Sequence, residues 1–254
     1  MNKIAMAMTV FVAGSLQGAI IDYRDAASVS PASPGNVIAR TNGLFTVSAS
    51  GWSAGSAGTS MFTAASLNDY GTAGLGVCTI SESSGGCSGS GNPSEHQLDN
   101  TDNHEFVMFQ FSSSTSAQVN VTNLQVLIGS LAIDYDVSYW LGNTSNTFNL
   151  GTLNAAGLAA AGFAARVDIS SVTLGGADGN GWGNVNIGNL TGYNTLIFGP
   201  SVIQTRGDDG FKLKQISFTN PSGTGTGEGV PEPGTYALMG AGLLGLGYWR
   251  RKKT

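Results

Sequence analysis

Residues 132–141 read Ala-Ile-Asp-Tyr-Asp-Val-Ser-Tyr-Trp-Leu, and apolar and polar side chains alternate through most of this stretch. At a period of two, one face carries apolar and aromatic side chains, and the other carries Asp134, Asp136 and Ser138. Such alternation is typical of a half-buried β-strand. The stretch therefore predicts a strand with one face in a core.

Strand chemistry recurs along the chain, and we predict further strands over residues 105–111, 121–128, 166–174, 184–190, 194–199 and 211–218. Gly129-Ser130 suits a hairpin turn, and a phase shift near Gln215 indicates a bulge. Only the Ala-rich residues 150–165 predict a short helix, which Gly157 and Gly162 weaken. We expect an all-β antiparallel β-sandwich or jelly-roll-like domain with at most one short helix.

The composition favours a secreted β protein. Gly supplies 38 of the 254 residues, and only 11% of the residues are charged, against about 25% in ordinary globular proteins. The 11 Lys and Arg residues are outnumbered by 16 Asp and Glu residues. A nucleic-acid-binding protein is therefore excluded, because such proteins carry a basic patch that attracts phosphates.

The N-terminus has the pattern of a secretory signal peptide over residues 1–19. Lys3 supplies the positive charge, residues 4–12 form an apolar run, and small residues up to Ala19 supply the cleavage site. We expect recognition by the Sec machinery and cleavage by signal peptidase after Ala19.

The C-terminus has the pattern of a membrane segment followed by a basic end. An apolar run over 235–249 follows Pro231-Glu232-Pro233, and Arg250-Arg251-Lys252-Lys253 comes next. Fifteen helical residues reach about 22 Å, against about 30 Å of hydrocarbon, so the transmembrane helix is short. The four cations should stay in the cytoplasm, which leaves the body outside.

This tail, residues 230–254, resembles the PEP-CTERM sorting signal of Gram-negative bacteria, with Pro231, Glu232 and Pro233 as its box and Arg250 and Arg251 in its basic end. The resemblance implies an exosortase as partner, which removes the tail. It also implies a protein anchored in the inner membrane before processing and found at the cell surface afterwards. Bacteria with this system typically make exopolysaccharide and biofilms. A plain C-terminal anchor is the alternative, although such an anchor does not require the Pro-Glu-Pro box.

The body, residues 20–220, is an acidic domain joined to the tail by a Gly/Ser/Thr linker at 221–229. Together with this linker, residues 20–229 have six basic and 15 acidic residues, a formal charge of about −9. Its two cysteines, Cys78 and Cys87, enclose a Ser/Gly-rich stretch. In an oxidising compartment we expect them to form a local disulfide.

One polar segment, residues 93–105, is the starting point for any enzymatic hypothesis. It holds both histidines, and His96, Asp99 and His104 would serve a secreted hydrolase as acid/base residues. No nucleophile elbow or His-Glu-x-x-His motif accompanies them. A structured loop whose side chains bond to their own backbone is the simpler interpretation, so we assign no catalytic residue.

The same segment resembles a subgroup of exosortase-dependent surface proteins. That subgroup combines a His-x-x-Asp-Asn motif, here at 96–100, with an Asp-x-Asp-x-Ser strand, here at 134–138. The resemblance implies surface localisation and no particular activity. The sequence indicates no organic cofactor, but Asp99, Asp134 and Asp136 offer the hard oxygen ligands of a structural Ca²⁺ site.

Aromatic residues leave sugar binding open as a second alternative. Trp52, Tyr139, Trp140 and Trp182 either pack in the core or stack on sugars, and Trp182 is the one we expect to be exposed. The sequence as a whole predicts an exported, exosortase-processed surface or matrix protein that is not an enzyme and associates with exopolysaccharide. A secreted hydrolase and a carbohydrate-binding module are the alternatives.

Overall fold

The computed structural model describes residues 17–24, 33–43, 45–55, 60–79, 97–100, 103–113, 122–129, 136–145, 147–170, 182–188, 193–203 and 210–220. The chain divides into two compact units, Met1–Gly223 and Thr224–Thr254. All of the described residues lie in the first unit. The linker and the sorting tail, including the predicted helix over 235–249, lie outside the described residues.

The described part of the first unit is all-β, as predicted, and every strand pairing among its residues is antiparallel. The thirteen strands are β1 (Gln17–Asp22), β2 (Val37–Asn42), β3 (Phe45–Ala54), β4 (Thr63–Asp69), β5 (Leu75–Cys78), β6 (Leu98–Asp99), β7 (His104–Ser113), β8 (Thr122–Gly129), β9 (Val137–Gly142), β10 (Val167–Ile169), β11 (Trp182–Gly188), β12 (Thr195–Pro200) and β13 (Gly210–Asn220).

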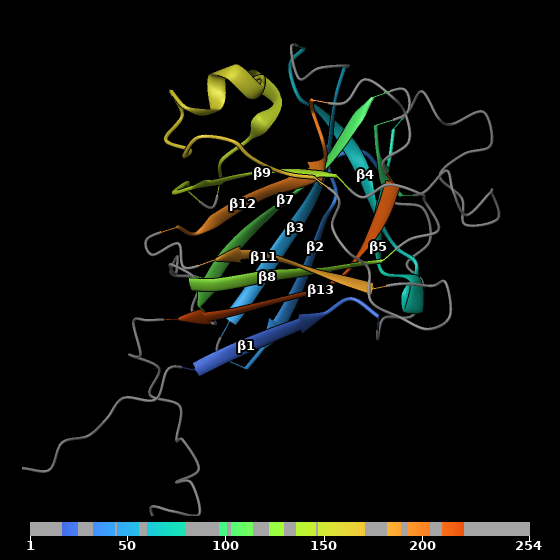
Figure 1. The fold of residues 1–254 in the computed structure, drawn as a ribbon, viewed down its shortest axis with the longest axis vertical. Helices are drawn as coiled ribbons and strands as arrows, with labels where there is room; N and C mark the ends of the chain where they lie inside the picture. The colour runs from blue at the N-terminus through green and yellow to red at the C-terminus, as the bar shows by residue number, and fades with distance from the viewer. Residues whose placement is uncertain are drawn as a thin grey trace, which may run out of the picture. The chain divides into compact units, whose positions relative to one another are not determined.

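The strands form one curled sheet in the order β10-β9-β12-β7-β3-β4-β5-β13-β8-β11. Strand β2 also pairs with β3, and β1 and β6 pair with β13. In Figure 1, β1, β13, β8 and β11 cross in front of β2, β3 and β7. Strands β4 and β5 connect the two halves, which gives a sandwich-like arrangement.

The main core lies between the two halves of the sheet. Along β7, Val107, Phe109 and Phe111 alternate into this core and are at most 1% exposed. From β13, Phe218 meets the ring of Phe111 edge-on, with 5.0 Å between the ring centroids. Edge-to-face aromatic pairs add to the stability that apolar burial provides.

A second core covers the opposite face of β7, β9 and β12. Phe106 of β7 and Trp140 of β9 belong to it, together with Leu150, Leu158 and Phe163 from the segment after β9. All six residues of β9 and all six of β12 are buried, because this segment covers the face of the sheet that points away from the main core.

The predicted helix over 150–165 is instead two 3₁₀ helices, η5 (Leu150–Thr152) and η6 (Ala155–Leu158). The side chains of Asn149 and Asn154 accept hydrogen bonds from the amides of Gly151 and Gly157, so each short helix starts with its own cap. Asn side chains favour such local turns over a continuous α-helix. A third 3₁₀ helix, η2 (Gly71–Ala73), connects β4 to β5.

The predicted hairpin at Gly129-Ser130 is wrong. Strand β8 pairs with β13 and β11, whereas β9 pairs with β12 and β10, so the two strands belong to different halves of the sheet. The bulge near Gln215 is confirmed, because the register of β13 against β8 skips Lys214, between Leu213 and Gln215.

Candidate functional site

The body's histidine and carboxylate cluster is only partly described. His96 and Asp134 lie outside the described residues. Asp99, His104 and Glu105 are all buried. In β7, His104 and Glu105 are consecutive and therefore point to opposite faces of the sheet. The amide of Asp99 contacts the Glu105 carboxylate at 3.4 Å, so β6 approaches β7 on the Glu105 side.

The calcium site proposed from Asp99, Asp134 and Asp136 stays a prediction. Asp99 and Asp136 are 8% and 5% exposed. Asp136 precedes β9, and its carbonyl accepts a hydrogen bond from the amide of Ser201 at 3.0 Å. Within the described ranges, no group of three His, Cys, Asp or Glu side chains is placed to hold a metal ion.

The cysteine pair is also half described. Cys78 ends β5 and is 2% exposed, while Cys87 lies outside the described residues. The disulfide therefore stays a prediction. Strand β5 anchors one end of the loop that it would close.

Three of the four candidate sugar-stacking residues are core residues. Trp52, Tyr139 and Trp140 are 6%, 5% and 3% exposed, and they pack within the two cores. Trp182 begins β11, but its side chain is outside the described part. Among the described side chains of these four, none is available as a sugar platform.

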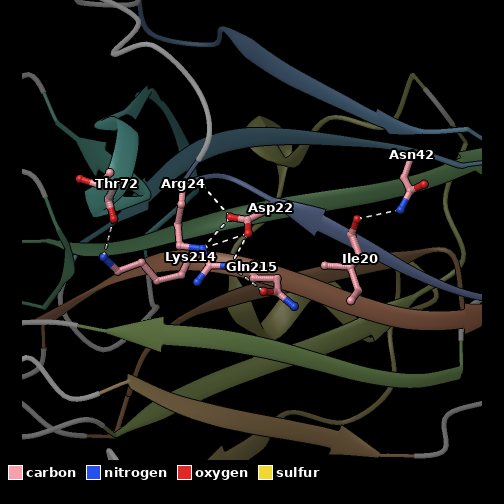
Figure 2. Close-up of polar contacts among 7 residues, drawn as sticks. All are labelled: Ile20, Asp22, Arg24, Asn42, Thr72, Lys214 and Gln215. Carbon is pink, nitrogen blue, oxygen red and sulfur yellow. Dashed lines mark hydrogen bonds and ion pairs between the residues drawn. The ribbon is translucent and has the colours of Figure 1, made fainter. Parts of the chain in front are cut away.

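A basic cluster that the sequence analysis did not single out lies where β1, β2 and β13 meet the turn after β4. It consists of Arg24, Arg40, Lys212 and Lys214, four of the five basic residues that the structure describes. Figure 2 shows Arg24 and Lys214 side by side, above the ribbon of β13.

The turn over residues 69–74 holds three of these cations. The guanidinium of Arg40 pairs with Asp69 at 2.7 Å. The ammonium of Lys212 lies 4.0 Å from the centroid of the Tyr70 ring, and that of Lys214 donates to the carbonyl of Thr72 at 3.0 Å. One turn thus positions three positive charges in three different ways.

Arg24 extends the basic cluster along β1. Its guanidinium donates to both carboxylate oxygens of Asp22 and also to the side-chain oxygen of Gln215 at 3.2 Å (Figure 2). The hydrogen bonds from Arg24 to Asp22 lower the pKa of the Asp22 carboxyl. The side chains of Arg24 and Arg40 keep 37% and 31% of their surface exposed, so solvent reaches the cluster.

The pKa values of both lysines in the basic cluster are lowered. Burial lowers the pKa of Lys212 to about 8, and the charge of Lys214 adds to the shift. Burial also lowers the pKa of Lys214 to about 8, and the charge of Arg24 adds to it. Among the described ion pairs, Asp22 pairs with Arg24 and Asp69 pairs with Arg40, and neither carboxylate pairs with a lysine. An additional anion would relieve this repulsion and raise both lysine pKa values.

A sequence signal for this cluster did exist. Lys212 and Lys214 are two residues apart in a predicted strand, which places both on one face. Their approach to Arg24, Arg40 and the 69–74 turn depends on pairing between strands far apart in the sequence, which the local pattern does not reveal.

Comparison with protein families identifies the C-terminal segment. Residues 229–252 match the PEP-CTERM protein-sorting motif. Comparisons with curated proteins and with solved structures yield no match. No helix in the described part of the chain is long and apolar enough to span a membrane.

The match confirms that the tail is a PEP-CTERM sorting signal. A chain with this motif is an exosortase-targeted surface protein. It is exported and held in the membrane during sorting, before the tail is processed.

Proposed function

We propose that this protein is a non-catalytic component of the cell surface or extracellular matrix that associates with exopolysaccharide after exosortase has removed its tail. The sorting motif at 229–252 carries the proposal. The formal charge of residues 20–229, about −9, supports it, because net charge keeps a secreted domain soluble.

Sorting can be tested on the Pro-Glu-Pro box. Replacing Pro231, Glu232 and Pro233 with alanines should leave the tail uncleaved and the protein in the membrane fraction. The matched control replaces Thr224, Gly225 and Thr226, which lie before the motif. Fractionation and intact mass report the result. Unchanged tail removal and release in the box variant would refute the assignment.

Matrix association requires a surface that an acidic polymer can approach despite the negative charge of the body. The basic cluster is the described surface that supports this proposal, since three of its cations contact the 69–74 turn and Arg24 lies beside Lys214 at Gln215. Next to it, the outward face of β13 continues with half-buried Gln215 and Ser217, whose side chains can hydrogen-bond to sugar hydroxyls.

A binding experiment can separate this surface from non-specific attraction. Polygalacturonate should bind the mature domain in a salt-sensitive manner, whereas neutral dextran should not. Lys212→Gln should weaken binding about fivefold, which corresponds to roughly 1 kcal/mol. Arg166→Gln makes the same change in charge beside Asp168 and should leave binding unchanged. Equal effects of the two variants would contradict a role for the basic cluster.

A further inference from the structure

The first strand of the domain overlaps the segment expected to be removed on export. Strand β1 begins at Gln17, and its residues Gln17, Gly18 and Ala19 pair with Asn220, Thr219 and Phe218 of β13. Cleavage after Ala19 would remove half of this six-residue strand.

Ala19 is part of the main core. It is 2% exposed and lies directly opposite Phe218. Phe218 is 3% exposed and contacts the rings of Phe45 and Phe111, with centroid distances of 5.5 and 5.0 Å. Loss of Ala19 would uncover this aromatic group and weaken the packing at this end of the core.

A cut after Ala19 would also place a new α-ammonium group on Ile20. Ile20 pairs with Ser217 in β13, and its carbonyl accepts a hydrogen bond of 3.0 Å from the Asn42 side chain of β2 (Figure 2). Ile20 is itself 55% exposed, so the main loss would be the pairing of Gln17, Gly18 and Ala19 with β13 and the burial of Ala19.

From these contacts we propose that signal peptidase cleaves before β1, after Ser15, so that the mature protein begins at Leu16. Ala13-Gly14-Ser15 has the small residues at the first and third positions before the cut that such sites require. It directly follows the apolar run over 4–12 and leaves all of β1 in the mature chain. The inference rests on the export that the proposed function includes.

The test is the N-terminal sequence and intact mass of the protein recovered from the cell envelope or the medium. A mature chain that begins at Leu16 supports the proposal, and one that begins at Ile20 overturns it. A chain that retains Met1 and stays inside the cell overturns export as well. Failure of the cleavage site and failure of the proposed function are thus distinguishable.

Two variants test the position of the cleavage site through N-terminal processing, which does not depend on the stability of the folded domain. Ser15→Tyr places a large residue directly before the proposed cut and should cause the uncleaved precursor to accumulate. Ala19→Val would block only the alternative cut, so its N-terminal processing should match that of the unmodified chain, whatever its effect on stability. Normal processing of Ser15→Tyr together with a block in Ala19→Val would overturn the proposal.

Discussion

The side chain of Asn36 binds the backbone of Leu67 as a neighbouring strand would. Its Nδ2 donates to the carbonyl of Leu67 at 2.8 Å, and its Oδ1 accepts from the amide of Leu67 at 2.8 Å. Leu67 is completely buried in β4, at the point where β4 stops pairing with β3 and starts pairing with β5. The side chain of Asn36 thereby completes the hydrogen bonding of β4, the strand that passes from one half of the sheet to the other.

Asn36→Ala should destabilise the domain by roughly 2–4 kcal/mol, because it leaves both backbone groups of a buried residue without this partner. Asn42→Ala is the matched control, since Asn42 makes one exposed hydrogen bond to the carbonyl of Ile20 and should cost less than about 1 kcal/mol. Urea unfolding measures both. Similar costs would show that Asn36 does not act as a substitute strand.

The sequence predicted the strands from β7 onward better than the strands that precede β7. Strands β7 and β13 alternate large apolar residues with polar ones, so their local pattern was sufficient. Strand β3 reads Phe-Thr-Val-Ser-Ala-Ser-Gly-Trp-Ser-Ala and has few large side chains. Its assignment depends on pairing with β2, β4 and β7, which no local pattern encodes.

For the candidate site too, local sequence reveals linear motifs but does not reveal residues that only folding brings together. The sorting motif is linear, and the sequence alone identified it. The basic cluster joins Arg24 to Lys214 across 190 residues of sequence. Only the pairing of β1 with β13 brings them together.

Gly74 is a position where an added side chain has no space. Its φ is +94°, and a Cβ built there would lie 2.2 Å from the carbonyl oxygen of Leu213. Gly43 also has a positive φ, +49°, but its Cβ would meet nothing within 4 Å. Gly43→Ala should therefore cost roughly 1–2 kcal/mol, and Gly74→Ala should cost at least about 2 kcal/mol more because backbone must move. Soluble yield and urea midpoints compare the two, and equal losses would contradict this account.

The predicted Cys78–Cys87 disulfide has a measurable consequence. Closing so short a loop should stabilise the domain by roughly 2–3 kcal/mol through the unfolded state. The double variant Cys78→Ser/Cys87→Ser should unfold at a lower urea concentration than the oxidised protein. Intact mass with and without reductant counts the thiols. Two free thiols in protein recovered from outside the cell would exclude the bond.

The predicted calcium site can be tested by thermal unfolding. If Asp99, Asp134 and Asp136 bind Ca²⁺, added calcium should raise the Tm and a chelator should lower it, because a ligand that binds only the folded state stabilises it. Asp134→Asn should reduce this response. An identical Tm with calcium and with chelator would eliminate the site.

The lysines of the basic cluster should make stability depend on alkaline pH. The pKa values of Lys212 and Lys214 fall from 10.5 to about 8 in the folded protein. Between these values the unfolded chain binds more protons than the native one, so the contribution of both lysines to the free energy of unfolding increases with pH. Their charged forms oppose folding below about pH 8, and this opposition is lost as the pH rises.

Urea unfolding at pH 7.5 and pH 9.5 should therefore show a larger gain, or a smaller loss, for the unmodified protein than for Lys212→Met/Lys214→Met. Other groups titrate in both proteins, so the difference between them isolates the two lysines. Arg166→Met is the control, because a guanidinium keeps its charge across this range. A binding anion such as polygalacturonate should shift the same transition to higher pH, since it favours the charged ammonium groups. If the stability of the double variant and that of the unmodified protein respond identically to pH, then folding does not lower the pKa values of Lys212 and Lys214.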